Sequence, residues 1–484
     1  MELLHLLLLS LLSFAPSATT AWPFSNSVPA PAPLPVRRGT NARLVLHDET
    51  FTPNIILRLT SAQMDVACKS RLSTVINGTL PGPEIRLPAG ETTWIRVYND
   101  MTTQNATVHW HGLSQRAAIF SDGTPGASQW PIAPGHFFDY EVHPEAGDAG
   151  TYFYHSHVGF QASTASGPLI VEDAKGKVPY KYDEEMVVHL QDFFHRSDDS
   201  IEKGLISRPF KWSGETGAVL INGQGVARGS QAGEKGCDLP VLEVEPGKTY
   251  RMRWIGATAL SMIQLGIEKH EGFKIIAADG QYTKPHTEKY MQVSPGQRFD
   301  VLFKAKSTSQ LNGKTDYLIQ YTTKDRPEKT TFYAVLRYKG GKPTITKAPE
   351  TALLDLNFDP TTWAEYALQP LVSNNFPSAG EVTRRIEIYD RQLIGNTFIW
   401  RANGDQWNSS TPEVTPGDAP YLINIYNKGP SAIPDFQKAI KNKGWDPVTY
   451  TWPAKVGEVL EIVWYNTGSL VHDNGGSVFE GCKG

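Results

Sequence analysis

The feature that most constrains this chain is a ten-residue pattern that recurs three times. In each copy, at residues 90–99, 247–256 and 457–466, a Gly turn leads into alternating apolar and polar side chains and ends at a small or polar residue. Alternation with a period of two is typical of a half-buried β-strand. A pattern that returns at wide intervals indicates repeated structural units.

A second, shorter element accompanies this pattern. Ile-Asn-Gly stands at 76–78 and 221–223, ahead of the first two copies, and Arg-Ala-Asn-Gly at 401–404 is a weak third counterpart. We therefore expect three tandem β domains. Their expected bounds are residues 42–175, 183–345 and 375–484. The alternative is that a Gly turn followed by a strand is simply common in β proteins.

Composition supports an all-β chain. The 484 residues include 42 Gly, 34 Pro, 12 Trp, 19 Tyr and 20 Phe, a combination of turn formers and aromatic residues that favours strands. Short stretches such as 93–98, 241–244 and 385–389 fit strands of sandwiches or barrels. The stretch from Pro434 to Lys443 fits a short helix, because Pro stands at its start and Gly just after its end.

Charge and cysteine content exclude several classes of protein. Lys and Arg number 46 and Asp and Glu 50, so the net charge is −4 and offers no electrostatic basis for a nucleic-acid partner or an anionic membrane surface. Three cysteines are too few for a disulfide scaffold or a Cys-rich zinc protein. Cys68 and Cys237 are able to pair in an oxidising compartment, but their spacing does not establish it.

The N-terminus predicts export. Residues 1–21 hold an apolar run too short to span a bilayer, followed by small residues that suit signal-peptide cleavage after about Ala21. Glu2 stands where a basic residue is usual, and the alternative is a buried N-terminal helix. Residues 22–41 read as a Pro-rich linker. Glycosylation sequons, which fit the same route, occur at Asn77, Asn105 and Asn408. With no later segment of transmembrane length, we expect a soluble, secreted, extracellular protein.

Two His-x-His pairs point to metal binding. The 13 histidines of the chain would give about 0.35 such pairs by chance, yet His109 pairs with His111 and His155 with His157. In a strand, residues i and i+2 face the same side, so each pair presents two imidazoles together. Imidazole favours copper, zinc, iron or nickel over magnesium or calcium. The alternative is a set of exposed or hydrogen-bonded strand histidines.

The residues around these pairs resemble the multicopper oxidase family, most closely its fungal laccase and ascorbate oxidase types. The motifs include Val-His-Trp-His-Gly-Leu-Ser-Gln at 108–115, Asp-Gly-Thr-Pro-Gly at 122–126 and Gly-Thr-Tyr-Phe-Tyr-His-Ser-His at 150–157. Further matches lie at 76–85, 166–171, 279–282 and 294–302. The resemblance covers roughly residues 42–475.

The resemblance implies three cupredoxin-like Greek-key β-sandwich domains and a copper cofactor. It implies one-electron oxidation of a small-molecule reductant, a phenol or an enediol, coupled to reduction of O₂ to water. By position, His109 would ligate the type 2 copper, His111 and His155 one type 3 copper, and His157 the other. Asp122 matches an acid that helps to supply protons during O–O cleavage; a turn-forming Asp before Gly is the alternative, and the two roles are compatible.

The other histidines belong to no ligand motif. We expect surface or hydrogen-bonded roles for His136, His143, His189, His195, His270 and His286. Trp130 stands where many relatives have Cys, so the disulfide formed there in those relatives is not expected. The sequence does not indicate an oligomeric state.

The third domain departs from the family pattern. The resemblance implies His-Pro-x-His-x-His and, further on, His-Cys-His, and neither motif occurs in the 484 residues. His472 is a lone histidine, and Cys482 has no histidine neighbours. We therefore expect no encoded type 1 copper site and an incomplete third domain, with unpaired strand edges and exposed apolar faces. A premature stop, a frameshift, a retained intron or a short isoform would produce such a chain.

Two functions of different classes follow. One is the copper-dependent oxidase that the family implies. The other is a catalytically inactive, secreted copper-binding product, which the missing type 1 Cys favours because that thiolate would carry electron entry. A nitrite-reductase-like trimer is a more distant alternative and needs the same missing ligands. Substrate pockets of the family lie beside the type 1 site, so the reductant is not readable from this chain.

Overall fold

The computed structural model describes residues 47–469, except 175–176, 210, 234–236, 325, 357–362, 375, 395–397, 404–406 and 409–418. The signal peptide expected at 1–21 and the linker expected at 22–41 lie outside the described residues, as do His472 and Cys482. None of the described helices is long and apolar enough to cross a membrane.

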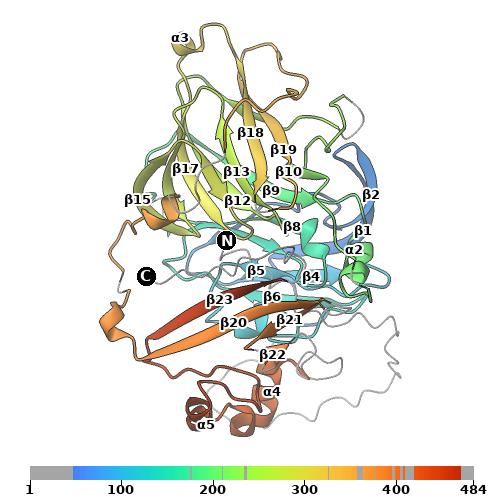
Figure 1. The fold of residues 1–484 in the computed structure, drawn as a ribbon, viewed down its shortest axis with the longest axis vertical. Coiled ribbons are helices and arrows are strands. Elements are labelled where there is room, and N and C mark those ends of the chain that lie inside the picture. The colour runs from blue at the N-terminus through green and yellow to red at the C-terminus, as the bar shows by residue number, and fades with distance from the viewer. Residues whose placement is uncertain are drawn as a thin grey trace.

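The strands of the described chain form five β-sheets and fall into three successive groups (Figure 1). The all-β expectation is confirmed. The first group forms two four-stranded sheets, ordered β2-β1-β4-β6 and β3-β8-β7-β5. Its strands are β1 (Ile55–Val66), β2 (Lys69–Ile76), β3 (Ile85–Pro88), β4 (Thr93–Asn99), β5 (His109–His111), β6 (Phe137–Val142), β7 (Gly150–His155) and β8 (Ser166–Glu172).

The second group forms a six-stranded sheet, β10-β9-β12-β17-β14-β15, and a five-stranded sheet, β11-β19-β18-β13-β16. Its strands are β9 (Glu184–Phe193), β10 (Ala218–Ile221), β11 (Val241–Val244), β12 (Thr249–Gly256), β13 (Met262–Ile267), β14 (Phe273–Ala278), β15 (Gln281–Glu288), β16 (Met291–Val293), β17 (Arg298–Lys304), β18 (Asp316–Lys324) and β19 (Thr331–Tyr338). Two helices accompany them, α2 (Asp198–Leu205) and α3 (Thr308–Leu311).

The third group forms a single four-stranded sheet in the part of the chain that is described, ordered β22-β21-β20-β23. Its elements are β20 (Arg384–Ile394), β21 (Phe398–Ala402), β22 (Trp407–Asn408), β23 (Leu460–Ser469), α4 (Tyr421–Lys428) and α5 (Phe436–Lys441). Helix α5 confirms the helix expected at 434–443, although Asp435 rather than Pro caps its start. Ile462 and Trp464 of β23 are 49% and 36% exposed.

The sequence repeat corresponds to a structural repeat. Its three copies become β4, β12 and β23, and each pairs in parallel with the first strand of its own group, β1, β9 or β20. The last residue of each copy holds the same register position. Asn99 stands opposite Leu59, Gly256 opposite Leu190 and Asn466 opposite Asp390. The three groups are therefore built on one parallel pairing that adopts the same register three times.

The Asn-Gly element is also repeated in three dimensions. Asn77, Asn222 and Asn403 have φ angles of 52°, 51° and 50°, a left-handed conformation that Asn tolerates better than most residues. Each Oδ1 accepts the backbone N–H of a residue on the first strand of the group, at 2.7, 2.8 and 2.7 Å: Arg58, His189 and Tyr389. Each Nδ2 donates to a backbone carbonyl of that same strand, two residues before the residue whose N–H is bound. These carbonyls belong to Ile56, Val187 and Glu387. The weak third counterpart in the sequence is therefore structurally equivalent to the other two.

We expect Asn222→Ala to lower the free energy of unfolding by about 2–3 kcal/mol. The substitution removes two hydrogen bonds, worth roughly 1 kcal/mol each, and places a Cβ-bearing residue without a local hydrogen bond at positive φ. Asn222→Gly is the control, since it removes the same hydrogen bonds without the conformational strain and should cost about 1 kcal/mol less. Urea unfolding measures both. A loss below about 0.5 kcal/mol for Asn222→Ala would show that the turn contributes little.

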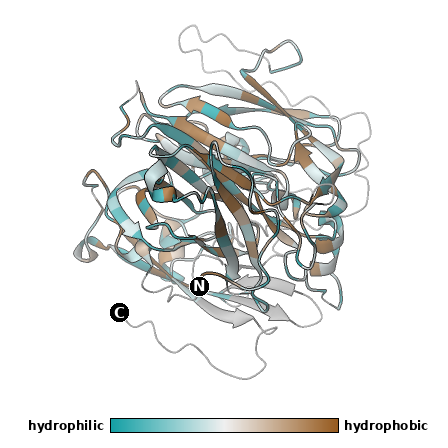
Figure 2. Cartoon of the chain, turned by 90° about the horizontal axis from the view of Figure 1, so that it is seen from above, coloured by the Kyte–Doolittle hydropathy of each residue, from teal (hydrophilic) through white to brown (hydrophobic). Residues whose placement is uncertain are grey.

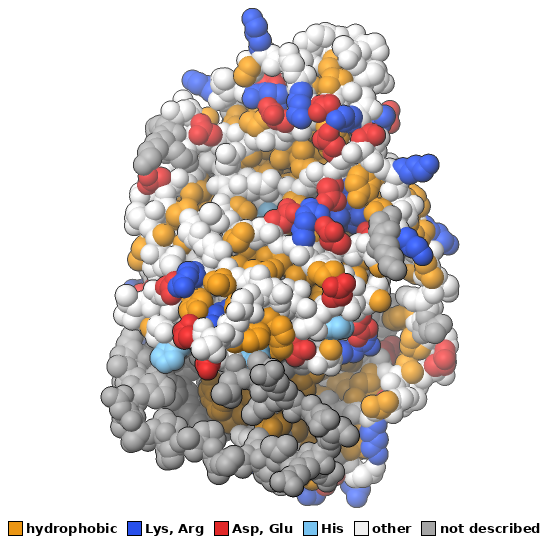
Figure 3. Space-filling view, turned by 180° about the vertical axis from the view of Figure 1, so that it is seen from behind, with side chains coloured by type: hydrophobic (Ala, Val, Ile, Leu, Met, Phe, Trp, Pro, Cys, Tyr) orange, Lys and Arg blue, Asp and Glu red, His pale blue; other side chains and the backbone are white. Residues whose placement is uncertain are grey.

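The core follows the strands. One apolar cluster fills the second group around Trp254, Ile263 and Val301, and another fills the first group around Trp110 and Tyr154. Hydrophobic residues run along the strands in the interior of the molecule (Figure 2). On the face drawn in Figure 3, basic and acidic side chains are interspersed over the described surface.

The first two groups are joined covalently and by buried charges. Cys68 and Cys237 form a disulfide, which resolves the pairing that their spacing left open. Thr151 of β7 donates a hydrogen bond to Asp300 of β17 (2.6 Å), whose carboxylate also accepts from Arg251 (2.8 Å). Strand β7, which also carries His155, is thereby tied to the six-stranded sheet.

One of the remaining histidines is fully buried, which the sequence did not indicate. His189 of β9 is 0% exposed, and its side chain interacts with that of Gln191. Burial lowers the pKa of His189 to about 3, so the ring is neutral. The reason is tertiary, because β9 lies inside a six-stranded sheet that packs against the first group. His136, His143, His270 and His286 are hydrogen-bonded and His195 is exposed, as expected.

Candidate metal centre

Strands β5 and β7 bring three of the four candidate histidines together. The strands pair antiparallel, with His109 opposite His155 and His111 opposite Phe153. Residues opposite each other in such a pair point to the same face of the sheet. Trp110, between the two histidines of β5, points the other way and is 0% exposed in the core of the first group. The alternation inferred for the first His-x-His pair is therefore present.

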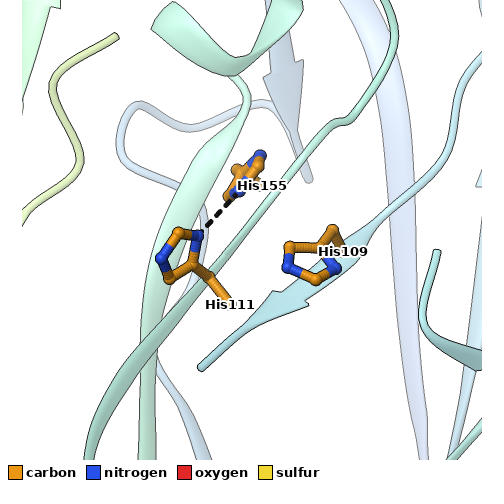
Figure 4. Close-up of side chains that lie close together, drawn as sticks. All are labelled: His109, His111 and His155. Carbon is orange, nitrogen blue, oxygen red and sulfur yellow. Dashed lines mark hydrogen bonds between the residues drawn. The ribbon is translucent and has the colours of Figure 1, made fainter. Parts of the chain in front are cut away.

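The ring nitrogens converge (Figure 4). Nitrogens of His109, His111 and His155 all lie within 4.8 Å of one another. Nδ1 of His111 and Nε2 of His155 are 3.3 Å apart. Two nitrogen ligands bound about 2.0 Å from one metal ion at a near-tetrahedral angle are separated by roughly 3.3 Å. This pair of nitrogens therefore has the spacing of ligands to a single ion.

His157 completes the group from just beyond the end of β7. Its ring centroid lies 5.7 Å from that of His109 and 5.9 Å from that of His155. Its Nδ1 is buried and has no hydrogen-bond partner of normal geometry among the described residues. A buried ring nitrogen without a partner is costly unless something else coordinates it.

Backbone carbonyls orient two of the rings. Nδ1 of His109 donates to the carbonyl of Asp122 (2.7 Å), and Nδ1 of His155 donates to that of Ser156 (2.8 Å). A hydrogen bond of this kind fixes the tautomer and leaves the Nε2 lone pair available for a metal. Both rings are therefore set to bind through Nε2.

Burial keeps His111, His155 and His157 neutral. It lowers the pKa values of His111 and His155 well below their ordinary range, with added repulsion from Arg298 at His111 and from His109 at His155. Burial and the nearby His109 also lower the pKa of His157 to about 4. Metal ligation needs the neutral imidazole. At neutral pH these three rings are in that form.

Asp122 lies beside His109, at a turn that precedes a glycine. It ends a 3₁₀ turn at Ile119–Ser121, and the following Gly123 has φ +83° and packs against the carbonyl of Val108, where any Cβ would overlap it. The carboxylate accepts the hydroxyl of Thr124 (2.5 Å) and lies 3.5 Å from Nδ1 of His109. Burial alone would raise the pKa of Asp122, but the hydrogen bonds from His109 and Thr124 outweigh it and the pKa is lowered.

The donor set fits copper. It consists of imidazole nitrogens alone, which converge on one another, and backbone carbonyls orient two of the four rings. Such a set suits copper, zinc, iron or nickel, and not magnesium or calcium. Paired β-sheets that carry these converging imidazoles define a cupredoxin-type metalloprotein.

Comparison with known proteins identifies the family. Residues 58–176 and 184–341 match models of the multicopper oxidase family. A laccase-like multicopper oxidase of Thermothelomyces thermophilus is 46% identical, covering 90% of this chain and 73% of that protein. An L-ascorbate oxidase of Cucumis sativus is 30% identical over 83% of this chain and 71% of that protein. The chain belongs to the multicopper oxidase family, of the laccase and ascorbate oxidase type, whose members are oxidoreductases that use copper and O₂.

The fold agrees with solved structures of the family. A laccase from Botrytis aclada superposes with a TM-score of 0.57 at 26% identity, covering 72% of this chain and 63% of that one. This chain thus spans just under two thirds of the length of that laccase.

Two residues near the cluster were missed in the sequence. Arg298 lies in the family-like motif at 294–302, which by itself indicates no role for it. Its guanidinium packs where Gly112, next to His111, has no side chain, and its Nε donates to the carbonyl of Thr151 (3.1 Å). Glu202 lies on α2, a helix that was not expected. The available signal was Ser197 followed by Asp198 and Asp199, a helix cap with an acidic first turn.

Proposed function

We propose that this protein is a secreted multicopper oxidase that couples one-electron oxidation of phenolic or enediol small molecules to the reduction of O₂ to water. The convergence of His109, His111, His155 and His157 on one face is the observation that carries the proposal. Family membership supports the reaction. The names of the relatives, laccase-like oxidase and ascorbate oxidase, support the two substrate classes, and the apolar N-terminal run supports secretion.

Each histidine has a proposed place in the copper site. His109 would hold the type 2 copper, His111 and His155 one type 3 copper, and His157 the other. The 3.3 Å separation of the His111 and His155 nitrogens supports their sharing one ion. When bound, copper supplies the electron transfer to O₂.

Asp122 would handle protons beside the cluster. Its lowered pKa makes the carboxylate the resting form, so it first accepts a proton and then passes it on during the reduction of O₂. The Thr124 hydroxyl and the His109 ring hold this carboxylate in place. We therefore propose that Asp122 relays protons rather than stores one.

A second candidate function is favoured by a specific absence in the sequence. The 484 residues contain neither His-Pro-x-His-x-His nor His-Cys-His. The second candidate is therefore a protein that binds copper through His109, His111, His155 and His157.

One experiment separates the two candidates. The purified secreted chain, residues 22–484, is given Cu(II). The oxidase candidate predicts a blue thiolate absorption band and O₂ consumption with a phenol or ascorbate, whereas the copper-binding candidate predicts Cu(II) uptake with neither property. If the second candidate is correct, joining a segment that carries His-Pro-x-His-x-His and His-Cys-His should produce both properties. A blue, O₂-consuming chain would contradict the second candidate and support the oxidase. A chain that binds no copper in either form would contradict both.

A further inference from the structure

Helix α2 forms hydrogen bonds with the loop that carries His157. This histidine loop, residues 156–165, leaves β7 after His155 and returns in β8. The Glu202 carboxylate accepts the backbone N–H of Phe160, and Oδ1 of Asp198 accepts the hydroxyl of Ser163 (3.0 Å). The helix therefore holds the loop at two points, the nearer of them three residues beyond His157.

A glycine makes the first contact possible. Gly159, two residues after His157, has φ +51°, and a Cβ at this position would overlap Oε2 of Glu202. The carboxylate thus fills the space that the missing side chain leaves. Gly is needed here both for its conformation and for this close approach.

The helix is itself firmly anchored. Arg71 of β2 donates to Oδ1 of Asp198 (2.5 Å) and to the carbonyls of Phe194 and Arg196 (2.8 Å each). Ile201 is 0% exposed and packs in a cluster with Phe160 and Phe194, whose rings lie edge to face at 5.3 Å. The hydrogen bonds of Arg71 and the packing of Ile201 therefore hold helix α2, and with it Glu202, in place.

The Glu202 carboxylate lies beside Gly159 without forming an ion pair with a Lys or Arg side chain of the described residues. Lys203, the next residue, pairs with Asp199 instead (2.7 Å), and no ion pair of Glu202 occurs in the part of the chain that is described. Burial and the neighbouring Asp199 raise the pKa of Glu202 to about 7. Placing a carboxyl group there costs stability, and perturbed groups of this kind gather at functional sites.

We propose that Glu202 is a positioning residue for His157. Its carboxylate packs against Gly159, where no side chain is present, and so holds the histidine loop with the His157 ring facing the other three imidazoles. This inference rests on the proposed function, since it assumes that the four histidines bind copper. Residues that orient a ligand without touching the metal typically contribute 10–100-fold to metal affinity.

The test uses Cu(II) and variants of the secreted chain, residues 22–484. Glu202→Ala should weaken Cu(II) binding by about 10-fold or more and change the Cu(II) EPR spectrum, because the loop loses its anchor. Glu202→Gln keeps an oxygen acceptor for Phe160 and should restore binding close to the parent. Lys203→Ala, on the exposed side of the same helix, is the matched control and should bind like the parent. Urea unfolding, run in parallel, shows that each variant is folded.

A double variant tests the contact itself. Gly159→Ala should weaken Cu(II) binding as Glu202→Ala does, and Gly159→Ala combined with Glu202→Ala should be no weaker than Gly159→Ala alone, because both changes break the same contact. Additive losses would overturn the inference. So would a folded Glu202→Ala variant with parental affinity and spectrum, or a Glu202→Gln variant as weak as Glu202→Ala. If the parent chain takes up no Cu(II), the proposed function fails and this inference with it.

Discussion

Replacing His155 with alanine is expected to lower the affinity of the chain for Cu(II) by more than about 100-fold. Removing a residue that only orients a ligand costs 10–100-fold, and losing a ligand costs more. His155 is central to the cluster, because it stands opposite His109 and its Nε2 lies 3.3 Å from Nδ1 of His111. Competition against a chelator of known affinity measures the change.

The control for this prediction is His136→Ala. It removes an exposed imidazole that bonds only to the carbonyl of Pro134 in the described structure and lies outside the cluster. Its Cu(II) affinity should equal that of the parent. A His155→Ala variant that stays folded and binds Cu(II) within about threefold of the parent would mean that the four histidines are not the copper site.

Asp300→Asn should lower the free energy of unfolding by about 3–5 kcal/mol, the usual cost of breaking a buried ion pair by removing one partner. Asp300 is 1% exposed and accepts from Arg251 (2.8 Å), Arg253 (3.3 Å) and Thr151 (2.6 Å). Its neutral replacement leaves two buried guanidinium groups short of negative charge. Urea or thermal unfolding measures the loss.

An exposed ion pair provides the control. Asp199 and Lys203 are paired at 2.7 Å but are 51% and 56% exposed, so Asp199→Asn should change stability by less than about 0.5 kcal/mol. Equal losses for Asp199→Asn and Asp300→Asn would contradict the special role of the buried cluster.

The same cluster predicts a dependence on pH. Burial by itself would raise the pKa of Asp300, but Arg251 and Arg253 reverse the effect and hold it below the ordinary 3.8. A carboxyl with a lowered pKa stabilises the folded state fully above its unfolded pKa, and that stabilisation is lost as the pH falls below it. The parent should therefore lose stability more steeply below about pH 4 than Asp300→Asn does.

The repeat in the sequence predicted the fold well because local rules determine it. Alternating side chains after a Gly turn at 90–99, 247–256 and 457–466 produce strands whichever domain surrounds them, and Asn at a positive φ produces the same turn at Asn77 and Asn222. Asn403 looked weak in the sequence because its neighbours differ. The backbone hydrogen bonds that define the turn do not depend on those neighbours.

The four histidines were also readable, because a period of two is enough to place His109 and His111 on one face. What the period does not show is which strand lies opposite. The pairing of β5 with β7 decides that His155 faces His109, and it depends on packing between residues more than 40 positions apart.

The sequence by itself determined the all-β class, the threefold repeat, the family and the identity of the candidate ligands, because each depends on short-range patterns. Tertiary structure alone decided the Cys68–Cys237 bond, the burial of His189 and the contact of Glu202 with Gly159. These features join segments that are distant in the chain. Their energies come from exclusion of water and close approach, which arise only when separate sheets and helices pack together.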